Sequence, residues 1–268
     1  MRYGNEFLLP PCNELFNATE DWKHTDSIEQ WYKVRDTVPY GIDSFRYHYN
    51  NYGFRCDDFE SWEKHPFRIA FAGCSHTEGL GLPIEEIWPK LFLKKASEKL
   101  GVELPFWSIA RAGTGTDHMV RSLYHYGDLL RPQVIISYMP TYHRRERWHD
   151  DMYIPGQGTE IGKDAKKGYH FMEDRFVVYQ TEKNMAFIDM MLKKWDGLLL
   201  YVIPDWNTTS DIESLTQIKQ LEGDHFFEDF FMDYARDGQH AGPKANALFA
   251  EKMFNASWPI IEKRLRKT

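Results

Sequence analysis

The segment from Arg68 to Gly79 reads RIAFAGCSHTEG, and it decides how the rest of the chain is interpreted. A short apolar run, Arg68–Ala72, stops at Gly73 and is followed by small and polar residues, which is typical of a buried strand that ends in a turn. Ser75 lies in that turn. A serine between a strand and a helix can project its hydroxyl above a sheet, where backbone N–H groups can bind an oxyanion. Taken alone, such a turn is more often structural.

Short apolar runs and helical patterns alternate from Arg68 onward. Strands are predicted at Arg68–Ala72, Leu104–Ile109, Gln133–Met139, Gly197–Ile203 and within Phe226–Tyr234. Helices are predicted at Pro83–Leu100, where Pro89 must kink the helix or delay its start, and at Thr116–Leu130, Glu182–Trp195 and Pro243–Arg264. This alternation predicts a three-layer α/β/α fold with a doubly wound, mostly parallel, five-stranded, flavodoxin-like sheet. Such sheets bind ligands at the carboxyl ends of their strands.

Two segments lie outside this alternation. Residues 1–67 are rich in aromatic and polar residues, with a weak helical pattern at Ser27–Val34, and we expect an N-terminal extension packed on the core. Residues 68–268 form the predicted α/β domain. Residues 140–180 are too long for an ordinary connection, so we expect an insertion over the active-site face.

Composition limits the classes of partner. The 268 residues are 42% hydrophobic, which is enough for one sizeable core, and carry a net charge of -7. A nucleic-acid partner would need a basic stripe, and none is evident. No apolar run approaches the ~20 residues of a membrane span, and the N-terminal apolar patch is too short for a signal peptide. We therefore expect a cytoplasmic protein without nucleic-acid or membrane partners, and its oligomeric state stays open.

Two more predicted strand ends carry polar or glycine-rich turns. Ser108–Asp117, SIARAGTGTD, has two glycines that let backbone N–H groups approach a ligand. Asp237 lies three residues before His240, just ahead of the last helix. An aspartate at that spacing can bond one ring nitrogen of the histidine and leave the other free to take a serine proton. Each turn is weak evidence alone, but a doubly wound sheet would bring all three strand ends into one crevice.

Other chemistries fit the sequence less well. Thr77 stands where a G-x-S-x-G elbow needs glycine, and Gly73 and Gly79 are too widely spaced for a phosphate loop. A flavodoxin-like nucleotide binder would need an acidic ribose partner, which is not evident. The histidines offer no third metal ligand beside His118 and His125, so we expect no metal. The three cysteines, Cys12, Cys56 and Cys74, fit neither a disulfide framework nor a CxxC site, and Cys74 is expected to pack beneath Ser75.

Together these blocks resemble the SGNH hydrolases, the GDSL-type esterase superfamily, over about residues 47–265. The family block Gly-Asp-Ser-x-Thr-x-Gly matches Gly73–Gly79, with Cys74 in place of the aspartate. The glycine block matches Ser108–Asp117, and the Asp-x-x-His block matches Asp237–His240. An upstream signature, Asn-x-x-Gly-Phe/Tyr-Arg, resembles Asn50–Arg55.

One block departs from the family pattern. After the third strand the family places Gly-x-Asn-Asp, whose asparagine donates to the oxyanion hole, but this chain reads SYMPTYHRR over 137–145. Thr141, His143 and Arg144 are the candidates to replace the asparagine, and the sequence does not choose among them. The departure, with the change at Cys74, also supports an alternative: a non-catalytic binding or structural module on an SGNH scaffold.

The resemblance implies ester hydrolysis without a cofactor. Ser75 would be the nucleophile, His240 the base and Asp237 its partner, with the N–H groups of Ser75 and Gly113 in the oxyanion hole. His76, Glu78, Tyr142, His143 and Arg144 are candidate substrate contacts. Tyr142, Trp148, Tyr153 and Trp206 form either a sugar-stacking platform or ordinary core contacts. We expect a small-molecule or glycan ester as substrate, with a short acyl group such as a carbohydrate O-acetyl.

Overall fold

The computed structural model describes residues 11–140, 144, 146–149, 152–155, 174–203, 215–221 and 232–266. Its centre is a five-stranded sheet in the spatial order β4-β3-β5-β8-β9, with every neighbouring pair parallel. The strands are β3 (Ile69–Gly73), β4 (Trp107–Ser108), β5 (Val134–Tyr138), β8 (Leu198–Val202) and β9 (Ile218–Gln220). Counted along the chain this is the order 2-1-3-4-5 of a flavodoxin-like sheet, whose ligand crevice lies between the first and third strands. The predicted fold class is confirmed.

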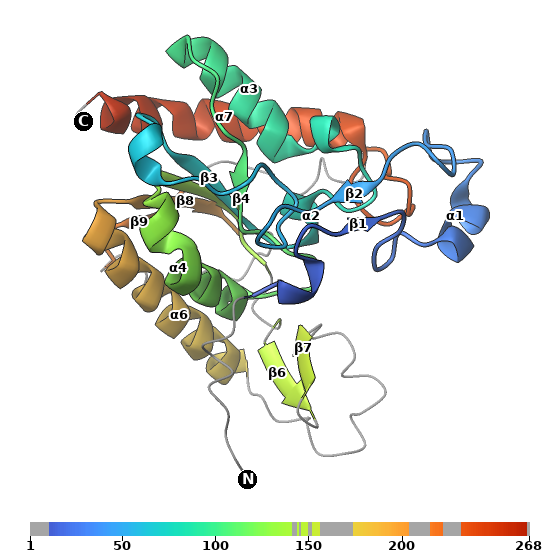
Figure 1. The fold of residues 1–268 in the computed structure, drawn as a ribbon, viewed down its shortest axis with the longest axis horizontal. Coiled ribbons are helices and arrows are strands. Elements are labelled where there is room, and N and C mark those ends of the chain that lie inside the picture. The colour runs from blue at the N-terminus through green and yellow to red at the C-terminus, as the bar shows by residue number, and fades with distance from the viewer. Residues whose placement is uncertain are drawn as a thin grey trace.

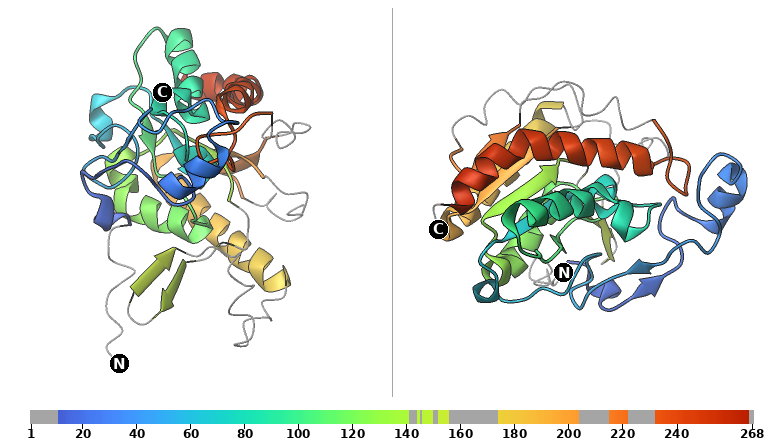
Figure 2. Two further views of the ribbon diagram at one scale, coloured as in Figure 1. Left: turned by 90° about the vertical axis from the view of Figure 1, so that its right-hand side faces the viewer. Right: turned by 90° about the horizontal axis from the view of Figure 1, so that it is seen from above.

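Four helices cover the two faces of the sheet (Figures 1 and 2). They are α3 (Trp88–Leu100), α4 (Thr116–Leu130), α6 (Asp174–Trp195) and α7 (Pro243–Leu265). Ile69 and Phe71 of β3 belong to a core shared with α3 and α7, whereas Ala70 and Ala72 belong to a core shared with α4 and α6. Successive side chains of a strand point to opposite faces, and here both faces are apolar because both are covered.

Pro89 explains the start of α3. The chain forms a short 3-10 turn at Ile84–Glu86, passes through an extended Ile87, and enters the helix at Trp88. Proline is tolerated in the first helical turn because its missing N–H would have no intrahelical partner there. The helix predicted from Pro83 therefore starts later, as the proline required.

The fifth strand of the described sheet comes from a segment for which no strand was predicted. It is β9, whereas the prediction within Phe226–Tyr234 falls mainly outside the described residues and its end, Tyr234, forms only an isolated bridge with Ala241. Only Ile218 is buried in β9, and Lys219 and Gln220 are exposed. A short edge strand with one buried side chain has no apolar run by which the sequence could reveal it.

The N-terminal extension contains the antiparallel pair β1 (Thr19–Glu20) and β2 (Tyr47–His48), and the helix α1 (Ile28–Val34). Short 3-10 turns occur at Asn13–Leu15 and Trp62–Lys64. Ser27 caps α1 by accepting a hydrogen bond from the Gln30 N–H at 3.2 Å. Tyr47 is fully buried in a cluster with Leu80 of the α/β region. Tyr47 thus contacts the α/β region, while an extension that ends at residue 67 and packs on the core stays a prediction.

The predicted insertion after the third sheet strand contains an antiparallel hairpin. Its strands are β6 (Glu146–His149) and β7 (Met152–Pro155), and Trp148 and Tyr153 are directly opposite in the register. Tyr142 and Trp206, the other two aromatic residues of the suggested stacking platform, lie outside the described residues. The platform stays a prediction.

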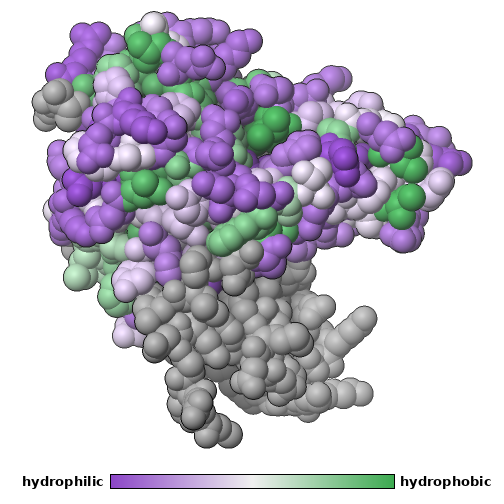
Figure 3. All heavy atoms as spheres, in the orientation of Figure 1, coloured by the Kyte–Doolittle hydropathy of each residue, from purple (hydrophilic) through white to green (hydrophobic). Residues whose placement is uncertain are grey.

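The exterior of the described residues is mainly polar. The face in Figure 3 is mostly hydrophilic, with hydrophobic residues in small separate patches. In the part of the chain that the structure describes, no helix is both long and apolar enough to cross a membrane.

Candidate active site

Gly73 sets the geometry of the turn that carries Ser75. Its φ is +149°, and a Cβ atom there would lie 2.3 Å from Thr77 Oγ1 and 2.7 Å from the Tyr138 carbonyl oxygen. Only glycine allows this close approach between β3, β5 and the following turn. Ser75 is therefore the first residue of the short helix α2 (Ser75–Glu78), directly above the end of β3, and its side chain faces the candidate site described below.

Arg55 holds the other end of α2. Its guanidinium donates to the carbonyl oxygens of Gly79 at 2.7 Å and Leu82 at 2.6 Å, and it lies 4.5 Å from the centre of the Tyr47 ring. A buried cation at the carboxyl end of a helix satisfies carbonyl groups that have no helical partner. The signature that resembles Asn-x-x-Gly-Phe/Tyr-Arg thus supports the serine turn and does not line the pocket.

Glu78 occupies a different place from the one predicted. Its carboxylate is buried, accepts a hydrogen bond from the Tyr49 hydroxyl at 3.1 Å, and accepts a short one from the Ala112 N–H. It therefore joins the serine turn to the glycine block. Glu78 does not line the candidate site, so its position gives no support to the predicted substrate contact.

The loop before α7 has a compact backbone. Asp233 accepts hydrogen bonds from the N–H groups of Lys244 and Ala245 at the start of the helix. Tyr234 and Ala241 form a bridge, and the Ala235 N–H donates to the His240 carbonyl oxygen at 2.9 Å. These bonds close the loop into a tight arch, which brings Asp237 and His240 onto the same side.

Ser75, His240 and Asp237 form a continuous chain of hydrogen-bonding groups. His240 Nε2 lies 2.9 Å from Ser75 Oγ, and His240 Nδ1 lies 2.6 Å from Asp237 Oδ2. Ser75 is 2% exposed and Asp237 is fully buried. This arrangement can take a proton from a serine hydroxyl, because the carboxylate fixes the ring orientation and leaves Nε2 free to act as the acceptor.

The Asp237 carboxyl stays ionised in spite of its burial. Burial alone would raise the pKa of Asp237, but hydrogen bonds and the charge of the His240 ring, with smaller contributions from the His240 N–H and the Thr25 hydroxyl, lower the pKa to about 2. A carboxylate that accepts several hydrogen bonds favours its charged form. Asp237 is thus a fixed negative charge beside the imidazole.

Ser75 and His240 line a pocket of about 330 Å³. Gly113, with φ +76°, also lines it, and neither the Gly113 N–H nor the Ser75 N–H donates a hydrogen bond within the described part of the chain. Two backbone donors beside the serine hydroxyl are the elements of an oxyanion hole. The neighbouring Ala112 N–H is already bonded to Glu78 and is not available for that role.

His76 and Arg144 line the same pocket. The His76 ring centre lies 5.0 Å from that of His240, and burial, together with the charges of His240 and Arg144, lowers the pKa of His76 well below 6.5. His76 is therefore neutral at pH 7. Arg144 packs against α4, because its carbonyl oxygen lies 2.0 Å from the position of a Cβ on Gly115. Thr141, Tyr142 and His143, also predicted at this site, lie outside the described residues.

The extension adds two pocket residues that the sequence did not indicate, His24 and Thr25. The Thr25 hydroxyl donates to Asp237 Oδ2 at 2.7 Å, and the Gln30 amide donates to the Asp237 carbonyl oxygen at 3.0 Å. Both contacts join residues more than 200 positions apart, and neither Thr25 nor Gln30 belongs to a recognisable motif. No pattern in the sequence points to these two contacts, because a pairing between residues so far apart along the chain leaves no local spacing.

Cysteine and metal chemistry receive no support from this geometry. Cys74 is buried and does not line the pocket, although it precedes Ser75. The described residues contain no group of three or more His, Cys, Asp or Glu side chains that could hold a metal ion.

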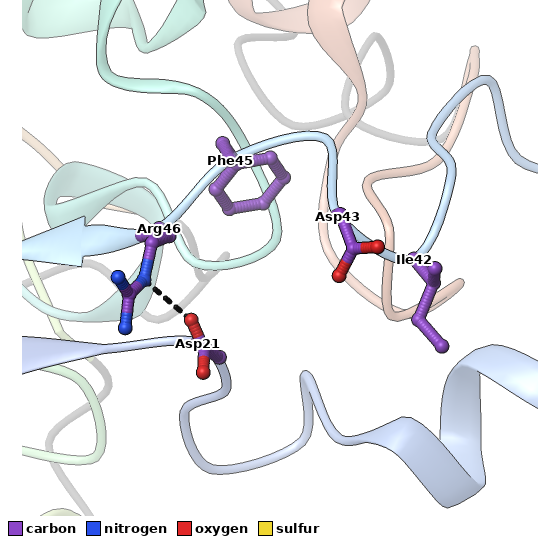
Figure 4. Close-up of a pocket in the computed structure, with 5 residues that line it drawn as sticks. All are labelled: Asp21, Ile42, Asp43, Phe45 and Arg46. Atoms are coloured by element: carbon purple, nitrogen blue, oxygen red, sulfur yellow. Dashed lines mark ion pairs between the residues drawn. The ribbon is translucent and has the colours of Figure 1, made fainter.

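A second pocket, of about 290 Å³, lies at the extension and is lined by Asp21, Ile42, Asp43, Phe45 and Arg46 (Figure 4). An ion pair of 2.5 Å joins two of these lining residues, Arg46 and Asp21. None of the predicted catalytic residues lines this pocket.

Comparisons with known proteins give matches in structure only. No model of a known protein family matches the chain, and no curated protein matches it. Among solved structures, TesA is similar with 14% identity over 73% of this chain and 98% of the other, at a TM-score of 0.48. The psychrotrophic esterase EstA from Pseudoalteromonas sp. has 14% identity, 72% and 98% coverage, and a TM-score of 0.47. A lipase from a goat rumen metagenome has 16% identity, 72% and 98% coverage, and a TM-score of 0.46.

Further similar structures are described as GDSL-like lipases, one of them from Bacteroides thetaiotaomicron.

Proposed function

We propose that the protein is a serine esterase of the SGNH type, with Ser75 as nucleophile, His240 as general base and acid, and Asp237 as the group that orients the imidazole. The observation that carries the proposal is the chain of contacts from Ser75 Oγ to His240 Nε2 at 2.9 Å and from His240 Nδ1 to Asp237 Oδ2 at 2.6 Å, at the wall of a pocket. A complete set of three groups in hydrogen-bond reach is what nucleophilic acyl transfer requires.

The proposed reaction has two steps. Ser75 Oγ attacks the acyl carbon while His240 Nε2 takes the hydroxyl proton, and the carbonyl oxygen becomes an oxyanion held by the N–H groups of Ser75 and Gly113. The carbon–oxygen bond to the alcohol then breaks, and the proton on Nε2 goes to the leaving oxygen. Water adds to the acyl-enzyme in the same way and regenerates Ser75. The charge of Asp237 stabilises the imidazolium formed in both steps.

Arg144 is our proposed replacement for the missing block-three asparagine. It follows β5, the strand after which the family asparagine is expected, and it lines the pocket with Ser75 and Gly113. A guanidinium carries five N–H donors and a permanent charge, so it can donate to an oxyanion. Thr141 and His143 stay alternatives from the sequence.

The proposed substrate is an ester with a short acyl group, such as an O-acetyl group on a carbohydrate. The pocket of about 330 Å³ is near the lower end of ligand pockets, which range over about 300–1,000 Å³, and this favours a small acyl group over a long chain. The glycan part of the proposal depends on the aromatic residues of the predicted insertion. No cofactor takes part in the proposed reaction.

The direct test is hydrolysis of a short acyl nitrophenyl ester by the whole protein and by Ser75→Ala. We expect kcat/KM to fall by at least about 10³-fold, because the nucleophile is lost while binding remains. Ser44→Ala is a matched control, since its exposed hydroxyl donates to the nearby Gly41 carbonyl oxygen and Ser44 does not line the pocket. A fluorophosphonate probe should label the native protein at Ser75 and leave Ser75→Ala unlabelled. Unchanged hydrolysis in Ser75→Ala, or absence of labelling in the native protein, contradicts the proposal and favours a non-catalytic module.

A further inference from the structure

We infer that the tight turn Lys23–Asp26 of the N-terminal extension is part of the active site, and that Thr25 is a positioning residue for the Asp237–His240 pair. The inference rests on the proposed function for its catalytic meaning. It goes beyond that proposal by assigning a role to a segment that lies outside the three sequence blocks.

The turn presents two residues to the pocket. The Lys23 N–H donates to the Asp26 carbonyl oxygen at 2.8 Å, and the Asp26 N–H donates to the Lys23 carbonyl oxygen at 2.9 Å, so His24 and Thr25 form its tip. Both tip residues line the pocket. His24 has φ +53°, a left-handed conformation that is uncommon for residues other than glycine. Such conformations persist where the surrounding structure fixes them, and they are frequent at functional sites.

The Thr25 hydroxyl completes the hydrogen bonds of the Asp237 carboxylate. Oδ1 accepts from the N–H groups of Gln239 at 2.9 Å and His240 at 3.0 Å. Oδ2 faces His240 Nδ1 at 2.6 Å and accepts from the Thr25 hydroxyl at 2.7 Å. The Thr25 hydroxyl therefore occupies one side of Asp237 Oδ2, and His240 Nδ1 can approach this oxygen only from the other side. Without the hydroxyl, that oxygen keeps only its imidazole contact, and the ring loses a constraint on its orientation.

The turn is attached firmly to the loop that carries Asp237. The fully buried guanidinium of Arg236 contacts both oxygens of Asp26, from Nε at 3.0 Å and Nη2 at 2.7 Å. It lies between the Trp22 and Phe45 rings, 4.1 Å and 3.9 Å from their centres. Arg236 directly precedes Asp237, and Asp26 directly follows Thr25. The ion pair therefore joins the immediate neighbours of Thr25 and Asp237, and so holds the Thr25 hydroxyl beside the Asp237 carboxylate.

The packing of α1 supports the same conclusion. A Cβ atom on Gly238 would lie 2.8 Å from Val34 Cγ1, and the Gln30 amide reaches the Asp237 carbonyl oxygen. Three successive residues of the loop, Arg236 to Gly238, therefore contact the extension. Because these contacts include Asp237 and both of its chain neighbours, the extension contributes to the geometry of the proposed triad.

The kinetic test compares Thr25→Val, Thr25→Ser and the control Thr37→Val. Valine keeps the shape of threonine and removes the hydroxyl, whereas serine keeps the hydroxyl. The Thr37 hydroxyl donates to the Val34 carbonyl oxygen at an exposed site. With a short acyl nitrophenyl ester we expect kcat to fall about tenfold in Thr25→Val with KM within about twofold, since the lost bond acts on the catalytic pair. Thr25→Ser is expected to recover most of the rate, and Thr37→Val to keep all of it. Equal losses of kcat in Thr25→Val and Thr25→Ser would mean that Thr25 acts through its packing and not through its hydroxyl, and would overturn the inference.

A second measurement needs no substrate. The proton on His240 Nδ1 is expected to give a low-field NMR signal in the native protein and in Thr25→Ser, and to be broadened by exchange with water in Thr25→Val. If Thr25→Val does not fold, Thr25→Ala is measured in its place. An unchanged signal and an unchanged kcat would overturn the inference. A native protein that hydrolyses no ester while its Nδ1 signal depends on the Thr25 hydroxyl would refute the proposed function and leave the positioning role intact.

Discussion

Asp237 combines complete burial with a full set of hydrogen-bond donors, and this makes its charge sensitive to pH in a predictable direction. Its pKa is lowered from 3.8 to about 2 in the folded protein. A carboxyl whose pKa is lower when folded stabilises the fold above pH 3.8, and this stabilisation is lost as the pH falls toward 2. The shift corresponds to about 2 kcal/mol.

We therefore expect Asp237→Asn to remove a pH-dependent part of the stability. Between pH 5 and pH 2 the free energy of unfolding should fall by about 2 kcal/mol more in the native protein than in Asp237→Asn, because all other carboxyls are common to both. Urea unfolding at several pH values measures this difference. Parallel pH curves for the two proteins would contradict it.

The residues of the proposed site differ in how visible they are in the sequence. Ser75 and the pair Asp237 and His240 lie in short blocks at strand ends, where local spacing already carries the chemistry. Thr25 lies in no block, and its contact with Asp237 spans 212 positions. Glu78 is the opposite case: it lies in a block and was a candidate substrate contact, and its carboxylate bonds Tyr49 and Ala112 inside the protein.

At the scale of elements, the turn between β3 and α2 depends on Gly73, because a side chain at this position would collide with the neighbouring residues. Gly73→Ala would place Cβ against Thr77 and the Tyr138 carbonyl oxygen, and part of that contact is with backbone that cannot move easily. Gly101 at the end of α3 is a suitable control, since it also has positive φ, +67°, but nothing lies within 4 Å of its Cβ position.

We expect Gly101→Ala to cost about 1 kcal/mol of stability, from its left-handed conformation alone, and to leave kcat unchanged. Gly73→Ala is expected to cost about 3 kcal/mol or more and to lower kcat, because β3 and the serine turn must separate. Urea unfolding and ester hydrolysis measure the two effects. Equal costs for the two substitutions would show that the close approach at Gly73 is not important.

The elements themselves were predictable to the extent that they carry a periodic pattern. The helix at Thr116–Leu130 agrees with its prediction at both ends, because its buried face repeats at helical spacing and a glycine precedes it. The bounds of β3, β5 and β8 agree with their predictions to within one or two residues, because each strand is an apolar run that is buried along most of its length. β4 and β9 are two and three residues long, and so short a strand depends on its neighbour more than on its own side chains.

At the scale of the whole molecule, the Asp26–Arg236 pair joins the N-terminal extension to the loop of the proposed triad. Both side chains are fully buried, and Tyr47 also donates to Asp26, at 2.5 Å. The sequence predicted that the extension packs on the core but not where, because the partners lie 210 residues apart and the pairing of charges over such a separation has no local pattern.

Removing one or both charges of this pair tests how the extension is held on the core. Arg236→Met leaves the Asp26 carboxylate buried with its main partner removed, and we expect it to cost about 3–5 kcal/mol of stability. In the double variant Asp26→Asn with Arg236→Met no charge remains buried, so the loss should be smaller than in the single variant by about 1 kcal/mol or more. Urea unfolding gives both free energies, and limited proteolysis reports whether the extension leaves the core first. A single variant no less stable than the double would mean that Asp26 is solvated once Arg236 is gone, and that the extension is held mainly by the apolar contacts around Tyr47.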